Sequence, residues 1–229
     1  MKKITAMLSF AAVAAASFVG ASQANAAFTT IQPARASEQS IPQILGHVYG
    51  GAFVDAGNGV DLTNGSLTAT RIDDAADQTL SLGKILSAKA LARFAASNQK
   101  FGIMNGKMLD VLFDVSGTGY AVSGSVANVD TGASPVAVGR GGWGGTFSSV
   151  DAMNSDLKDH MVSYVLSGQG VSDKTYVLFF EDIAGRGSDW DYNDMAVEVQ
   201  AAAVPLPGAL AMGLVTMAGG AVARRFRKA

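Results

Sequence analysis

The chain has 229 residues, of which 48% are hydrophobic and 16% are charged, and it contains no cysteine. This length suits one domain, and the lack of cysteine excludes disulfide scaffolds, thiolate metal sites and thiol nucleophiles. Residues 27–203 carry 11 basic and 19 acidic residues, which gives this part of the chain a formal charge of −8. Nucleic-acid binding normally needs a basic surface, so we exclude that class.

The N-terminal residues 1–26 have the three-part pattern of a secretory signal peptide. Lys2 and Lys3 precede an apolar run over residues 4–19, and Ala24-Asn25-Ala26 supplies an A-x-A cleavage site. Cleavage is expected before Ala27. A buried N-terminal helix is the alternative interpretation. We therefore expect residues 27–203 to form an exported domain.

The exported domain is expected to be mostly β, because sixteen of the nineteen acidic residues are Asp. Asp favours turns and is a poor helix former. Two short helices are nevertheless predicted from apolar residues at helical spacing. The first follows Ser40 and ends at Gly50-Gly51, and the second spans residues 85–96, with Leu91 and Phe94 on its apolar face.

Turns and short strands are predicted for the rest of the domain. Asn64-Gly65 and the Asp-rich residues 73–77 indicate turns. Asp73, Asp74 and Asp77 leave open a second acidic site, although turn residues are the preferred interpretation. Short runs rich in β-branched and aromatic residues predict an antiparallel, jelly-roll-like β-sandwich, with strands over residues 109–115, 120–126, 136–138, 161–166, 175–180 and 195–199.

The glycine-rich residues 139–145 are predicted to form a flexible loop. They are not a phosphate-binding loop, because no Lys-Ser/Thr pair and helix follow them. The two histidines are weak evidence for a zinc site, which usually needs three or four ligands. His47 is expected at the end of the first helix as a capping or surface residue. His160 is expected in a structural turn, and whether it belongs to a further site stays open.

The acidic loop of residues 181–194 is the strongest candidate site. Asp189, Asp191 and Asn193 alternate along the chain, so a tight turn can direct their oxygens to one centre. Ca²⁺ takes six to eight oxygen ligands, and a cation would remove the repulsion among the loop's carboxylates. We predict that Asp189, Asp191, Asn193 and Asp194 bind Ca²⁺, with further donors from Glu181 or Asp182.

There are two alternatives to this interpretation of the loop. An EF-hand is excluded, because Asp194 stands where that motif needs Gly and Gln200 where it needs Glu. A solvated acidic turn that caps its own backbone stays open as the other interpretation.

The same loop carries a family resemblance. Phe179-Phe180-Glu181-Asp182, a glycine-containing spacer and residues 189–194 resemble the closing motif of a domain of unknown function in bacterial surface proteins. Residues 159–164, 37–40, 49–50 and 92–95 are similar to that group as well. The resemblance spans roughly residues 37–200. It implies an extracellular β-domain that is suspected of binding calcium and has no assigned catalytic activity.

The C-terminal residues 204–229 combine a Val-Pro-Leu-Pro-Gly motif, an apolar stretch and a basic end. A helix over residues 206–222 would span about 26 Å, against about 30 Å for a bilayer core. The basic residues 224–228 would then stay cytoplasmic. A permanent membrane anchor is one interpretation of this tail.

The tail also resembles the PEP-CTERM class of bacterial sorting signals, in the variant built on Val-Pro-Leu-Pro-Ala, although Gly208 replaces the final Ala. This resemblance implies that an exosortase-type membrane protease of a Gram-negative bacterium cleaves near the motif. The protein would be held transiently in the inner membrane and then reach the cell surface or the extracellular matrix.

Together these patterns predict a non-enzymatic, calcium-stabilised protein of the cell surface or biofilm matrix. One alternative is a calcium-dependent module that binds extracellular polysaccharide, for which Trp143, Trp190 and Tyr192 would suit a sugar. The preferred interpretation of these aromatic residues is packing at the sheet edge. A secreted hydrolase is the third class, but a glycosidase needs carboxylates facing each other across the substrate, and here they share one loop.

Overall fold

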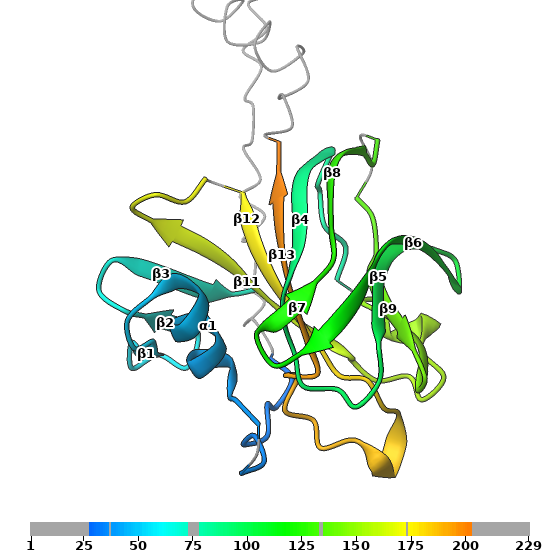
Figure 1. Cartoon of the computed structure of the whole chain (residues 1–229), viewed down its shortest axis with the longest axis horizontal. Coiled ribbons are helices and arrows are strands. Elements are labelled where there is room, and N and C mark those ends of the chain that lie inside the picture. The colour runs from blue at the N-terminus through cyan, green and yellow to red at the C-terminus, as the bar shows by residue number, and fades with distance from the viewer. Residues whose placement is uncertain (1–27, 37, 73–77, 133–134, 173, 203–229) are drawn as a thin grey trace, which may run out of the picture.

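The computed structural model describes residues 28–36, 38–72, 78–132, 135–172 and 174–202 (Figure 1). The predicted signal peptide and C-terminal sorting tail lie outside these residues, as do Asp73, Asp74 and Asp77. Within the described ranges, no helix is long and apolar enough to cross a membrane.

The described residues form two antiparallel sheets. The larger has eight strands in the order β1-β2-β3-β11-β12-β13-β4-β8, and the smaller has five in the order β10-β9-β5-β6-β7. This confirms the mostly β, antiparallel architecture. The strands are β1 Val54–Asp55, β2 Asp61–Thr63, β3 Leu67–Arg71, β4 Lys84–Arg93, β5 Gln99–Asn105, β6 Met108–Thr118, β7 Ala121–Ser123, β8 Ser125–Asp130, β9 Val138–Gly142, β10 Gly145–Ser148, β11 Met161–Gly168, β12 Thr175–Phe180 and β13 Met195–Ala201.

The helix predicted after Ser40 is confirmed as α1, Ile41–Tyr49. Ser40 and Gln43 form a capping box, in which the Gln43 Oε1 atom accepts a hydrogen bond of 2.8 Å from the Ser40 backbone nitrogen. Ile44 and Leu45 are fully buried in the hydrophobic core. Local capping and the buried apolar face together explain why this segment is helical.

The second predicted helix, over residues 85–96, is wrong, because this segment forms strand β4 and its continuation. Two register shifts in the pairing of β4 with β13 leave Leu86 and Leu91 without a partner on β13. Such bulges interrupt the two-residue alternation of a strand. They leave Ile85, Ala88 and Leu91 buried at intervals of three residues, which imitates a helical period.

The flexible loop predicted over residues 139–145 is also wrong, because this segment contributes to the hairpin of β9 and β10. Gly139 lies so close to Met104 and to the backbone of Phe147 that a Cβ atom there would collide with both. Close packing around position 139, and not chain flexibility, therefore explains why a glycine is needed there.

The eight-stranded sheet is covered on both faces. One hydrophobic cluster joins α1 to residues such as Val177 and Phe179 of β12. The other contains Leu178 and Phe180 of β12 together with residues of the five-stranded sheet, and the rings of Phe180 and Phe101 are 6.1 Å apart. β12 is therefore buried on both sides. The acidic loop therefore begins at the end of a rigid central strand.

Candidate metal centre

The acidic loop joins the ends of two central strands, β12 and β13, where Phe180 pairs with Met195. Within it, Trp190 and Tyr192 both have a φ of 58°, a left-handed conformation that is uncommon for bulky residues. Tyr192 is fully buried in the core and Trp190 packs against the same cluster. Because Trp190 and Tyr192 take this conformation, their aromatic side chains pack against the core. The polar side chains of Asp189, Asp191 and Asn193, which alternate with them, lie close together.

The structure brings the predicted acidic residues together in two groups. Oxygen atoms of Glu181, Asp189 and Asp194 all lie within 4.8 Å of one another, and so do those of Glu38, Asp189 and Asp191. Asp189 therefore belongs to both groups. Because calcium–oxygen distances are 2.3–2.6 Å, oxygens at this separation can share one ion.

Two of the predicted ligands lie outside both groups. The amide nitrogen of Asn193 donates a hydrogen bond of 2.8 Å to Asp191 Oδ2, which places Asn193 beside the second group. Asp182 Oδ2 instead accepts a hydrogen bond of 3.0 Å from Gln99 Nε2. Asp182 therefore faces the β5 and β9 strands.

Burial raises the pKa of several of these carboxyl groups. The pKa of Asp194 is raised to about 9, because burial disfavours the charged form and because Glu181 and Asp182 are nearby. The pKa of Asp191 is raised to about 7 by burial and by the negative charge of Asp189. Burial and Asp189 also raise the pKa of Glu181. In the absence of a cation, Asp194 therefore retains its proton at neutral pH.

Three polar residues that the sequence analysis missed support the acidic residues. Arg35 Nε lies 2.8 Å from Asp189 Oδ2. Arg140 is fully buried and donates hydrogen bonds to the Asp182 backbone oxygen and, over 2.7 Å, to Gln99 Oε1. Arg140 and Gln99 thus fix the start of the loop. The sequence analysis placed Arg140 in a flexible glycine-rich loop, and no local pattern links it to the acidic residues.

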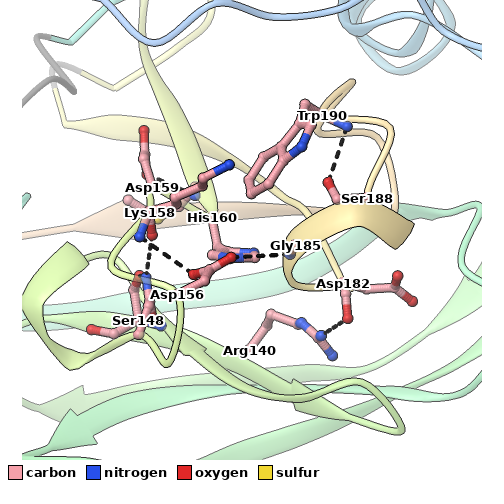
Figure 2. Close-up of polar contacts among 12 residues, drawn as sticks. Arg140, Ser148, Asp156, Lys158, Asp159, His160, Asp182, Gly185, Ser188 and Trp190 are labelled. Atoms are coloured by element: carbon pink, nitrogen blue, oxygen red, sulfur yellow. Dashed lines mark hydrogen bonds and ion pairs between the residues drawn. The ribbon is translucent and has the colours of Figure 1, made fainter.

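His160 forms part of the wall beside the acidic loop (Figure 2). Its ring is completely buried, is stacked on Phe147 with centroids 3.8 Å apart, and contacts Asp156 through Nε2 at 3.1 Å. Asp156 Oδ2 accepts a hydrogen bond of 3.2 Å from the Gly185 backbone. Burial lowers the pKa of His160. His160 therefore supports the loop through Asp156 and belongs to neither acidic group.

A pocket of about 190 Å³ opens beside the first acidic group. Glu181, Asp189 and Asp194 line it together with Arg35 and Trp143. Trp143, at the turn between β9 and β10, is 84% exposed. Trp190 instead packs on the core and lies 4.7 Å from the Lys158 ammonium group (Figure 2). Of the three aromatic residues considered for sugar binding, only Trp143 is freely exposed beside the carboxylates.

The comparisons with known proteins give one result. Residues 105–202 match a family described as a domain of unknown function, DUF4114. The DUF4114 match supports the similarity to an uncharacterised bacterial domain, and it includes the whole acidic loop but not Glu38 or Arg35. Neither the curated proteins nor the solved structures give a significant match to the chain.

Proposed function

We propose that the chain is an exported, non-enzymatic surface or matrix protein whose acidic loop binds Ca²⁺. The observation that carries this proposal is the first acidic group, in which oxygens of Glu181, Asp189 and Asp194 lie within 4.8 Å of one another. These side chains are held on a loop between two central strands. The ion would therefore act mainly as a structural link.

The donor chemistry favours Ca²⁺ over zinc. Each acidic group consists of carboxylates, which are hard oxygen ligands. Zinc prefers nitrogen and sulfur ligands, but the chain has no cysteine, and His160 Nε2 is engaged by Asp156. Backbone carbonyls and water would complete the coordination of Ca²⁺.

The burial of Glu181 and Asp194 also supports the proposal. Both residues are buried, Glu181 with 1% and Asp194 with 9% of its surface exposed. Burying a charged carboxylate is costly even where, as here, each accepts one backbone hydrogen bond, Glu181 from Trp190 and Asp194 from Asp182. A divalent cation would offset this cost, so binding should be coupled to folding stability.

Thermal unfolding of the full chain, purified in a mild detergent, tests the proposal. An ion that binds only the folded state stabilises it by about 2.7 kcal/mol at a hundredfold excess over Kd. Ca²⁺ should therefore raise the melting temperature relative to chelator. Asp194→Asn should reduce this rise, because it removes a ligand of the first acidic group. Because Asp194 already holds a proton at neutral pH, the neutral amide should leave the metal-free protein folded.

Asp114→Asn is the matched control, since Asp114 lies in β6 with its side chain 71% exposed and pairs with Lys100. This variant should keep the full response to Ca²⁺. A melting temperature that is identical in calcium and in chelator would refute calcium binding and leave the loop as an acidic turn that caps its own backbone.

A module that binds polysaccharide through calcium is the second candidate function. The exposed Trp143 beside the carboxylate-lined pocket favours it, because aromatic rings provide apolar contact area with a polar edge. Glycan-array binding that is lost with chelator and with Trp143→Ala would support this function. Trp143→Ala should leave the response of the melting temperature to Ca²⁺ unchanged.

A further inference from the structure

The second acidic group contains a residue from the other end of the domain. Glu38 lies just before α1, and its carboxylate approaches Asp189 and Asp191 with oxygens within 4.8 Å of one another. The segment that carries Glu38 is itself attached to the loop, because the Gln32 backbone nitrogen donates a hydrogen bond of 2.9 Å to the Trp190 oxygen. Figure 1 shows this N-terminal segment, in blue, and the yellow-orange loop at the same end of the molecule.

Two oxygen atoms at this second group lack hydrogen-bond partners. Asn193 is completely buried, yet its Oδ1 atom accepts no hydrogen bond. The Nδ2 atom of the same amide donates to Asp191 Oδ2 over 2.8 Å, so the Asn193 side chain is directed at the second group. Glu38 Oε2 is also inaccessible to solvent and unpartnered. A buried acceptor without a donor is costly, and a cation satisfies such an acceptor.

We propose that the centre binds two cations, with the Asp189 carboxylate bridging them. This inference rests on the proposed calcium function of the loop. The first Ca²⁺ is held by Glu181, Asp189 and Asp194. The second is held by Glu38, Asp189 and Asp191, with the amide oxygen of Asn193 as a further donor.

Bridging carboxylates are suited to closely spaced divalent ions, because each oxygen can face a different ion. In the metal-free protein, Arg35 supplies the positive charge beside Asp189, with its Nε atom 2.8 Å from Asp189 Oδ2. Arg35 is mostly exposed, at 63% of its side chain, so it can leave Asp189 when the cations arrive. The second ion would join residues 28–40 to the loop between β12 and β13.

Equilibrium dialysis of the full chain against radioactive calcium, in detergent, measures the number of ions bound. We expect two Ca²⁺ per chain for the unmodified protein. Glu38→Gln should bind one, because it removes a charge from the second group only. Asp194→Asn should also bind one, and the double variant should bind none. Asp114→Asn is the control and should bind two.

A second measurement separates local from global effects. Calcium should protect residues 32–40 from hydrogen exchange in the unmodified protein but not in Glu38→Gln, whereas the loop should be protected in both. Far-ultraviolet circular dichroism of Glu38→Gln should match that of the unmodified protein, because Gln has the same shape and Glu38 is only half-buried.

The outcomes distinguish this inference from the proposed function. One ion in both the unmodified protein and Glu38→Gln would refute the second site and leave the proposed calcium loop intact. Two ions in Glu38→Gln would also refute the role of Glu38. No bound calcium in the unmodified protein would overturn the proposed function together with the bridged centre.

Discussion

Trp190 and Tyr192 show how single residues shape the candidate site. Their left-handed backbone conformations cost of order 1–3 kcal/mol each. The cost is offset by packing and by a hydrogen bond of 3.0 Å from the Tyr192 hydroxyl to the Asp159 backbone oxygen. The alternation of Asp189, Asp191 and Asn193 is evident in the sequence. The conformation of the aromatic residues between them depends on the core, which local spacing does not reveal.

The raised carboxyl pKa values predict an unusual dependence of stability on pH. Without calcium, the folded state holds protons on Asp191 and Asp194 that the unfolded state releases near the ordinary aspartate pKa of 3.8. Stability therefore falls as pH rises towards the folded pKa values. We expect a loss of about 3 kcal/mol between about pH 6.5 and 8.5. Unfolded histidine, whose ordinary pKa is 6.5, is half protonated at the lower pH, and this offsets only a small part of the loss.

Urea unfolding followed by tryptophan fluorescence at the two pH values measures this loss. Saturating calcium should abolish it, because the bound ion keeps the carboxylates ionised in the folded state. Asp194→Asn should flatten the dependence without calcium. If the metal-free protein is equally stable at both pH values, these carboxyl groups are ionised and the described proton retention is wrong.

At the scale of the elements, β4 shows where sequence periodicity fails. The strands predicted over residues 175–180 and 161–166 are confirmed as β12 and as most of β11. β11 and β12 lie in the middle of the larger sheet and pair regularly with their neighbours, so their sequence composition matches the buried environment of interior strands. β4 instead contains two bulges in its pairing with β13. Their positions depend on that partner strand and cannot be read from the spacing of apolar residues in β4 itself.

The Arg140 side chain links β9 to the start of the acidic loop, so replacing it should lower the free energy of unfolding. Arg140→Leu leaves Gln99 Oε1 and the Asp182 backbone oxygen without a donor. Each unsatisfied buried group costs about 1–3 kcal/mol. We expect the free energy of unfolding, measured in urea with chelator, to fall by about 3 kcal/mol. Calcium should restore more stability to this variant than to the unmodified protein, because a nearby positive charge has been removed.

Lys100→Ala is the control for this change. Lys100 lies on the neighbouring strand β5 but is half-exposed, and its ammonium group is 3.6 Å from the exposed Asp114 carboxylate. Exposed ion pairs contribute about 0–1 kcal/mol, so this variant should be nearly as stable as the unmodified protein. Equal losses for the two variants would contradict a specific role of Arg140.

At the scale of the whole molecule, the export prediction concerns both ends of the chain. Lys2, Lys3 and the A-x-A site predict Ala27 as the mature N-terminus. Processing of the sorting signal should remove the residues beyond about position 207. Mass spectrometry of protein extracted from the cell surface should find both new ends. Met1 on the secreted form would refute signal cleavage, and an intact basic tail at residues 224–228 would indicate a permanent anchor.

The candidate site could be predicted only as far as it is local in sequence. The loop between β12 and β13 supplies Glu181, Asp189 and Asp194, which the sequence analysis selected. Glu38 and Arg35 reach the same place from the segment before α1, and no spacing rule links them to the loop. Their contribution depends on the tertiary fold, which brings the first described residues against the last loop.

The order of strands in the larger sheet constrains when the protein can fold. β3 pairs with β11, and β4 pairs with β13. Until residues 161–201 are available, β1–β3 and the pair of β4 with β8 have no strand to join them. Pairing between distant segments is slow, because the chain must close long loops first. The larger sheet therefore cannot be completed until nearly all of the chain has been synthesised, which suits the proposed export through a secretion channel.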